Sequence, residues 1–295
     1  MAYEMYGDES ADEQLRFRSF SVLSGPQDQL ADLRAKAEAV SEGWAEAKFT
    51  QVTGHSRNCR VARAFVDVTV CAASVGSVRM DVIIWDTHDR RHAVHGRDDT
   101  ANFGRMAYHL MQQIARRHAQ SDWAFYPDAG GSVNWIEVME YLNNTRLSGP
   151  GRTRQQGQAL FHVETPFISL TRFSPVDSKS ERLVQVADLF AGMACLSRHE
   201  EPACGHYHAG EWQQAASGAV MCLPFDDVER LALTNRKRAQ YELVCHTYDA
   251  CRSCKLGVSL RSTGYLRTPD WRKPVNFWHY EPQHEDDQAP TRDLQ

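Results

Sequence analysis

Three aspartates follow segments that have the composition of β-strands. Asp8 follows a short aromatic segment, Asp86 follows the clearest apolar strand pattern in the chain, and Asp128 follows Trp123-Ala124-Phe125-Tyr126. Side chains at the strand ends of an α/β sheet face the crevice in which ligands bind. An aspartate after a strand is also a common turn or helix-capping residue. The joint occurrence of the three, rather than any one of them, indicates a site.

A fourth aspartate, Asp188, lies inside the apolar helical segment 183–193. An ionised aspartate is almost never buried without a partner. Gln185 is three residues earlier and projects from the same helical face, while Gly192 leaves the next turn open. One interpretation is a buried aspartate paired with an arginine. The other is that Asp188 points toward the sheet and joins the strand-end acids around a cation.

Gathered carboxylates require a counter-charge. Alone they repel one another, and at neutral pH at least one of them would take up a proton. Mg²⁺ and Mn²⁺ favour oxygen ligands and would remove that penalty. Two such ions about 3.5–4 Å apart can activate water and stabilise the leaving oxygen of a phosphodiester. We therefore expect a metal-dependent nuclease that uses Mg²⁺ or Mn²⁺.

These motifs resemble those of the bacterial DUF3800 family. Tyr6-Gly7-Asp8-Glu9-Ser10 is similar to its D-E-S signature, and Gln185-Val186-Ala187-Asp188 is similar to its Q-x-A-D signature. Glu46-Ala47-Lys48 resembles its E-x-K element, Phe125–Asp128 its mid-chain strand, and Asn276–Tyr280 a closing motif of some members. The similarity spans most of residues 3–280. It departs from the signature at Ala11, where glycine usually stands.

The resemblance implies an RNase H-like sheet with Asp8 on the first strand and Asp188 on the last helix. A third acid is expected on an adjacent strand, and Asp86 and Asp128 compete for that role. Glu9 and Glu46 are further candidates. The full candidate catalytic set is Asp8, Glu9, Glu46, Asp86, Asp128 and Asp188, with Lys48 or Lys179 orienting the phosphate.

The order of strand and helix patterns predicts an α/β fold with a mixed sheet flanked by helices. We expect this domain to occupy residues 1–200, followed by a helical Cys/His-containing extension over 201–280 and a disordered tail over 281–295. The predicted strands are 3–6, 15–23, 46–50, 78–85, 123–126 and 161–173. The predicted helices are 27–42, 56–74, 99–114, 134–144 and 178–196, and residues 145–158 are expected to form a loop.

The C-terminal region is locally basic although the whole chain carries a net charge of −5. Residues 230–273 combine Lys and Arg with tyrosines and Trp271, a composition suited to nucleic acid. For Arg236-Lys237-Arg238 a solvated helix face is the simpler interpretation. The alternative function is thus a non-catalytic nucleic-acid- or partner-binding protein on the same fold.

The cysteines admit two interpretations. Cys251 and Cys254 form a C-x-x-C motif with Cys245 upstream, which makes structural zinc a candidate. Because the segment has a continuous helical pattern, ordinary buried thiols are the alternative. No stretch of the chain reaches the roughly 20 apolar residues of a membrane helix, and its start lacks the pattern of a signal peptide. We therefore expect a cytoplasmic protein without a membrane partner.

Overall fold

A computed structural model describes most of the 295 residues. The described residues are 2–10, 16–54, 56–89, 99–117, 122–130, 133–136, 138–139, 146–150, 162–166, 169–201, 203–209 and 234–281. The predicted tail beyond residue 281 lies outside these ranges, as do Glu137 and most of the predicted helix 134–144.

The central feature is a six-stranded mixed sheet with the order β7-β4-β1-β2-β3-β8. Its strands are β1 (Ala2–Ser10), β2 (Phe17–Pro26), β3 (Arg79–Asp86), β4 (Asp122–Pro127), β7 (Ser169–Phe173) and β8 (Val275–His279). Strands β1, β2 and β3 form an antiparallel meander, while β4 is parallel to β1, β7 to β4 and β8 to β3. The predicted fold class, an α/β mixed sheet flanked by helices, is confirmed.

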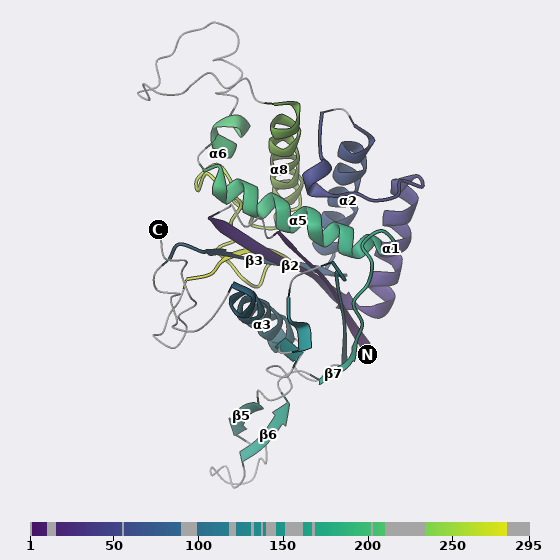
Figure 1. The fold of residues 1–295 in the computed structure, drawn as a ribbon, viewed down its shortest axis with the longest axis vertical. Coiled ribbons are helices and arrows are strands. Elements are labelled where there is room, and N and C mark those ends of the chain that lie inside the picture. The colour runs from purple at the N-terminus through teal and green to yellow at the C-terminus, as the bar shows by residue number, and fades with distance from the viewer. Residues whose placement is uncertain are drawn as a thin grey trace, which may run out of the picture.

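Helices cover both faces of the sheet (Figure 1). The helices α1 (Gln27–Ser41), α2 (Arg57–Ser74), α5 (Arg182–His199) and α8 (Asn235–Ser253) share one core with one face of β1–β3. Helix α3 (Asp99–Arg117) packs on the opposite face. Strand periodicity explains the division, because Met80 and Val82 face the first core while Ile83 and Trp85 face the second. The short helices are η1 (Phe49–Gln51) and α6 (Ala203–His208).

The residues after 233 are integrated into the main core. Strand β8 forms the edge of the sheet beside β3, and Leu243 and Val244 of α8 are fully buried in the same cluster as α5. None of the helices in the described ranges combines the length and the apolar character needed to cross a membrane.

Four local predictions are wrong. The expected strand 46–50 pairs with none of the described strands, because the Ala47 and Phe49 amides bond to side chains of α5, and the segment continues as η1. The predicted single strand 161–173 is two, β6 (His162–Pro166) and β7, which belong to different sheets. Part of the expected loop 145–158 is β5 (Arg146–Pro150), the antiparallel partner of β6. The predicted helix 178–196 is α5, which begins only at Arg182 and ends at His199, and the Glu181 side chain caps it by accepting from the Leu183 amide.

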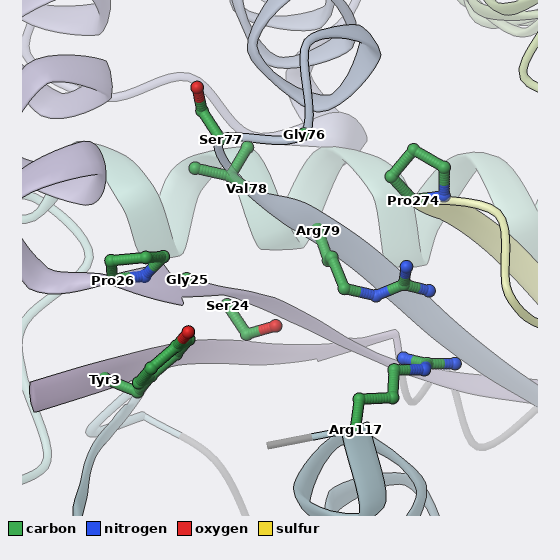
Figure 2. Close-up of a pocket in the computed structure, with 10 residues that line it drawn as sticks. All are labelled: Tyr3, Ser24, Gly25, Pro26, Gly76, Ser77, Val78, Arg79, Arg117 and Pro274. Carbon is green, nitrogen blue, oxygen red and sulfur yellow. The ribbon is translucent and has the colours of Figure 1, made fainter. Parts of the chain in front are cut away.

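A pocket of about 290 Å³ lies at the end of the sheet where β1 begins and β2 finishes (Figure 2). Tyr3 and Pro26 line it on one side, and Arg79 of β3 and Arg117 at the end of α3 line it on the other. It is remote from the strand end that carries Asp8, because β1 extends from Ala2 to Ser10.

Candidate acidic site

Three of the predicted acids lie on neighbouring elements. Asp8 is on β1, and Asp128 directly follows β4, the parallel neighbour of β1. The Asp128 amide donates to the Gly7 carbonyl at 2.9 Å, which fixes Asp128 beside Asp8. Asp188 comes from α5, which crosses β1 and β2 on the face toward which Asp8 points. The fold therefore brings together acids that are about 180 residues apart in the sequence.

Two buried serines of β2 hold α5 over the site. The Ser21 hydroxyl donates to the Ala187 carbonyl at 2.6 Å, and the Ser19 hydroxyl donates to the Ala191 carbonyl at 2.7 Å. Ser21 is also the register partner of Asp8 on β1, so the turn of α5 that carries Asp188 lies above Asp8. Sequence reasoning missed these serines. The available signal was the presence of small polar residues at alternate positions of a strand that is otherwise apolar on its inner face.

Burial and mutual repulsion perturb the acids. Only 8% of Asp8 is exposed. Burial raises the pKa of Asp8 well above its usual range, and the negative charges of Asp188, Glu9 and Asp128 raise it further, against a lowering by the Glu9 amide at 2.7 Å. Burial also raises the pKa of Asp188 to about 6, although the Phe49 amide and Lys48 oppose the rise. Both carboxyl groups are therefore short of positive charge.

The donor chemistry of the site fits a hard divalent cation. Asp8, Asp128 and Asp188 offer only carboxylate oxygens, the ligand type that Mg²⁺ and Mn²⁺ prefer. A cation would also relieve the repulsion that raises the pKa values of Asp8 and Asp188. Within the described ranges, no three His, Cys, Asp or Glu side chains already stand in a metal-binding group. The charges of Asp8, Asp128 and Asp188 act on one another, but their carboxylate oxygens are not yet close enough together to bind one metal ion.

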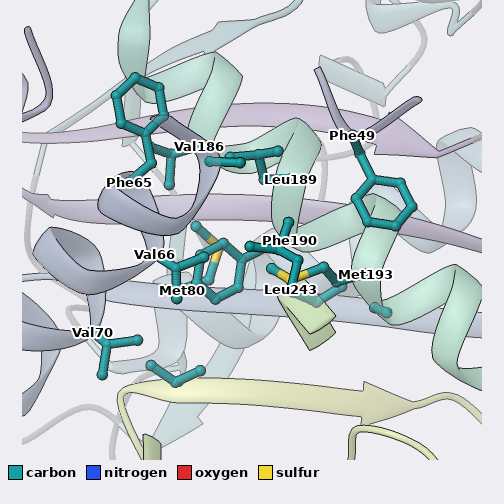
Figure 3. Packing of buried hydrophobic residues seen from close by; sticks show 14 of the residues in the cluster. Phe49, Phe65, Val66, Val70, Met80, Val186, Leu189, Phe190, Met193 and Leu243 are labelled. Atoms are coloured by element: carbon teal, nitrogen blue, oxygen red, sulfur yellow. The ribbon is translucent and has the colours of Figure 1, made fainter. Parts of the chain in front are cut away.

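Helix α5 clamps an extended segment against the site. The Gln185 side-chain oxygen accepts from the Ala47 amide at 3.0 Å, and Asp188 Oδ2 accepts from the Phe49 amide at 2.6 Å. A Cβ on Gly192 would lie 2.3 Å from the Phe49 ring, so only glycine leaves room for that ring. Figure 3 shows Phe49 in the core with α5 residues such as Met193. The Q-x-A-D motif and Gly192 thus position residues 46–49.

Glu46 and Lys48 project from this clamped segment. Glu46 Oε1 accepts from the Ser178 hydroxyl at 2.7 Å and lies 3.2 Å from Lys48 Nζ. Burial opposes the charged form of Lys48, but Glu46, Asp188 and Asp128 together raise its pKa above the ordinary value. Lys48 therefore remains a cation and interacts with two of the three acids. Lys179 differs, because its side chain is exposed and its backbone amide donates to the Asp177 carboxylate at 2.9 Å.

Asp86 does not join the acidic site. Its carboxylate forms an ion pair with Arg16 at 2.6 Å and accepts from the His88 amide at 2.9 Å. Strand register places Asp86 opposite Phe17 of β2, whereas Asp8 is opposite Ser21. Of the two candidates for the third acid, the structure places Asp128 beside Asp8 and Asp86 apart from it. Among the described residues, Asp188 accepts from the Phe49 amide and forms no ion pair with an arginine.

The cationic residues of α8 lie near the clamped segment. Arg236, Lys237 and Arg238 are exposed on the first turn of α8, and Lys237 forms an ion pair with Glu200 at 2.7 Å. The Gly54 amide donates to the Asn235 carbonyl at 3.2 Å, and the Gln240 side chain donates to the Phe49 carbonyl at 3.2 Å. The start of α8 is thereby attached to the segment that Asp188 holds.

The three cysteines of the proposed zinc set come from a single helix and its cap. Cys245 and Cys251 are on α8, and Cys254 is the exposed residue at its C-cap. Burial raises the pKa of Cys245 and of Cys251 to about 12 in each case. Since zinc binds thiolates, this environment favours the protonated thiol over the metal ligand.

The fold and these residues define an α/β protein that gathers carboxylates at the strand ends of a mixed sheet. No protein-family model matches the chain. The chain is 31% identical over 296 residues to the uncharacterized protein ORF2′ of Methanothermobacter thermautotrophicus, with 97% of this chain and 96% of the relative covered. It is also 31% identical over 301 residues to ORF2 of the same organism, with 97% of each covered. The chain belongs to the same family as these two archaeal proteins.

Proposed function

We propose that this protein is a metal-dependent nuclease that hydrolyses phosphodiesters, and that it is related to the DUF3800 family. The observation that carries the proposal is the shared electrostatic environment of Asp8, Asp128 and Asp188, in which burial and like charges raise the pKa values of Asp8 and Asp188. Perturbed carboxyl groups of this kind, gathered at the ends of strands, are characteristic of functional sites.

Asp8, Asp128 and Asp188 would hold the cation, while the negative charges of Glu9 and Glu46 act on Asp8 and Asp188 respectively. When bound, Mg²⁺ or Mn²⁺ would activate water and stabilise charge on the phosphate. The residues of the chain position the carboxylates and provide a positive charge for the phosphate. Ser21 and the clamp from α5 fix the spacing of Asp8 and Asp188, and Lys48 offers a positive charge to an incoming phosphate.

A second candidate function is nucleic-acid or partner binding without catalysis. It is favoured by the exposed cations at the start of α8, which is attached to the clamped segment through Asn235 and Gln240. In that case Arg236 and Arg238 would contact the phosphate backbone, and the acids would have a structural role. Binding would then be independent of Mg²⁺ and Mn²⁺.

The decisive experiment is a thermal-shift titration with Mg²⁺ and Mn²⁺, followed by cleavage assays on labelled DNA and RNA. Wild-type protein should be stabilised by the cations and should cleave, and Asp188→Asn should lose both properties. Asp86→Asn is the matched control, because its carboxylate lies outside the acidic site. Full turnover by Asp188→Asn would contradict the nuclease proposal. Cation-independent binding that Arg236→Glu weakens, without cleavage, would favour the second candidate.

A further inference from the structure

The pocket at the opposite end of the sheet contains an unusual concentration of buried charge. Arg79 and Arg117 both line it, and both lie against Asp81, whose side chain is 1% exposed. Arg117 donates to the Asp81 carboxylate at 2.9 Å, and Arg79 does so at 3.4 Å. Asn276 of β8 completes the group by donating to Asp81 at 3.2 Å. Two guanidinium groups therefore share one carboxylate.

Main-chain carbonyls orient these guanidinium groups without cancelling their charge. Arg79 donates to the carbonyls of Trp271, Arg272 and Lys273 at 2.6–3.2 Å, and Arg117 donates to that of Trp271 at 2.7 Å. The Arg117 side chain is only 10% exposed, and its Nε has no hydrogen-bond acceptor in the part of the chain that the structure describes. Dipoles compensate a full buried charge incompletely, so among the residues that the structure describes the two arginines and Asp81 leave one positive charge in excess.

The pKa of Arg117 is consistent with this excess of positive charge. Burial lowers it below the usual value for arginine, and the neighbouring Arg79 lowers it further, against a rise caused by Asp81. An anion in the pocket would relieve both effects. Figure 2 shows the Ser24 hydroxyl pointing toward the Arg79 and Arg117 guanidinium groups, with Tyr3 and Pro26 on the other side of Ser24.

We propose that this pocket binds a phosphate group, with Arg79 and Arg117 as its charged wall. Planar guanidinium groups match the oxygens of a phosphate and bind them through paired hydrogen bonds. Pro26, Val78 and Pro274 supply apolar walls. The volume of about 290 Å³ is near the lower end of the range, roughly 300–1,000 Å³, of small-molecule sites. The site is distinct from the acids, since Tyr3 and Asp8 are at opposite ends of β1.

Ser24 allows a test by charge alone. It is 2% exposed and is the register partner of Arg79 on the adjacent strand, so a carboxylate at this position would stand in for the bound phosphate. In Ser24→Asp, the new carboxylate would compete with phosphate for the two arginines. Ser24→Asn is the matched control, because asparagine has nearly the same shape as aspartate but no charge. Each variant is compared with wild type in a thermal-shift titration with inorganic phosphate. Phosphate replaces chloride in the buffer so that the ionic strength stays constant.

Wild type should gain about 2 °C when phosphate reaches about ten times its dissociation constant, and above that the gain should rise with the logarithm of the phosphate concentration. Ser24→Asn should keep this gain, whereas Ser24→Asp should lose it. Equal responses of the two variants, or a wild-type response no greater than that to chloride, would overturn the proposal. If the Ser24 variants do not fold, Tyr3→Glu and Tyr3→Gln repeat the comparison at the other wall of the pocket.

A parallel titration with phenyl phosphate distinguishes two sources of the phosphate. Tighter binding than that of inorganic phosphate would identify a phosphate ester whose body contacts Pro26 and Val78. Tighter binding of inorganic phosphate would identify the free ion as the ligand. Binding of neither overturns the proposal and leaves the nuclease proposal unaffected, because the acids are not involved.

Discussion

Asp188 Oδ2 accepts a hydrogen bond from the Phe49 amide at 2.6 Å, so the acid on α5 is also the residue that holds the segment carrying Glu46 and Lys48. One oxygen of the carboxylate is committed to this bond. A cation bound by Asp188 would therefore be coupled to the position of Lys48. Substitution by asparagine separates two roles of Asp188. Asparagine can still accept the hydrogen bond from the Phe49 amide, but it lacks the negative charge that would bind a cation.

Asp188→Asn should fold with little loss of stability, whereas Asp188→Ala should lose about 1–3 kcal/mol because the buried Phe49 amide is left without its acceptor. Urea denaturation of the two variants beside wild type measures the difference. Both variants should lose stabilisation by Mg²⁺ or Mn²⁺. Equal unfolding free energies for Asn and Ala would show that the bond to Phe49 contributes nothing.

Gly192→Ala should destabilise the protein by about 1–3 kcal/mol, because its Cβ would meet the Phe49 ring at 2.3 Å in a close-packed core. A double-mutant cycle with Phe49→Leu tests the cause, since the smaller side chain should reduce the cost of the added methyl group. Additive effects of the two substitutions would mean that the cost arises from α5 itself rather than from the contact with Phe49.

Asp8→Asn should raise the unfolding free energy at neutral pH in buffer containing a chelator. The pKa of Asp8 is raised in the folded state, so at a pH above its ordinary value the folded state binds more protons than the unfolded chain. Stability is therefore lost as pH rises through this region, and the asparagine variant should lose less. Denaturation across pH 4–9 for both proteins checks this, and a variant less stable than wild type throughout would contradict it.

Asp128→Asn should abolish metal-dependent cleavage, whereas Asp86→Asn should retain it. Asp128 contributes to the repulsion at Asp8 and Asp188, but Asp86 is occupied by Arg16. Because the side chain of Arg16 is 53% exposed, loss of that ion pair should change stability by less than about 1 kcal/mol. Cleavage rates and melting temperatures of the two variants, measured in parallel, test the assignment. The reverse pattern of activity would make Asp86 the third acid.

His279→Gln should reduce the loss of stability in mild acid. Burial lowers the pKa of His279 to about 4, whereas the unfolded side chain titrates near 6.5. Between these values the unfolded state binds more protons, so stability falls as pH decreases from 6.5 toward 4, by at most about 3 kcal/mol. Glutamine can still donate to the Leu266 carbonyl that His279 contacts at 3.0 Å. Any fall in unfolding free energy from pH 7 to pH 4.5 should therefore be smaller in the variant than in wild type.

Local sequence pattern predicted the elements whose side chains repeat regularly. Apolar spacing placed α1 and α2 within a residue or two, and apolar residues beside Asp86 marked β3. It failed for residues 46–50, whose composition is that of a strand. Their amides pair with Gln185 and Asp188, which are 138 and 139 residues away, and no local pattern contains such partners.

The sequence by itself determined the fold class and the acids worth attention, because periodicity and an aspartate inside an apolar helix are properties of short segments. Only the tertiary structure decided between Asp86 and Asp128. That choice depends on strand order, which places β4 beside β1 and separates Asp86 from Asp8 by register. The tertiary structure also decided the partners of Asp81, which are Arg79, Arg117 and Asn276. The local sequence pattern of β3 does not indicate them. Pairing between distant segments sets these relationships, and it is a property of the packed chain.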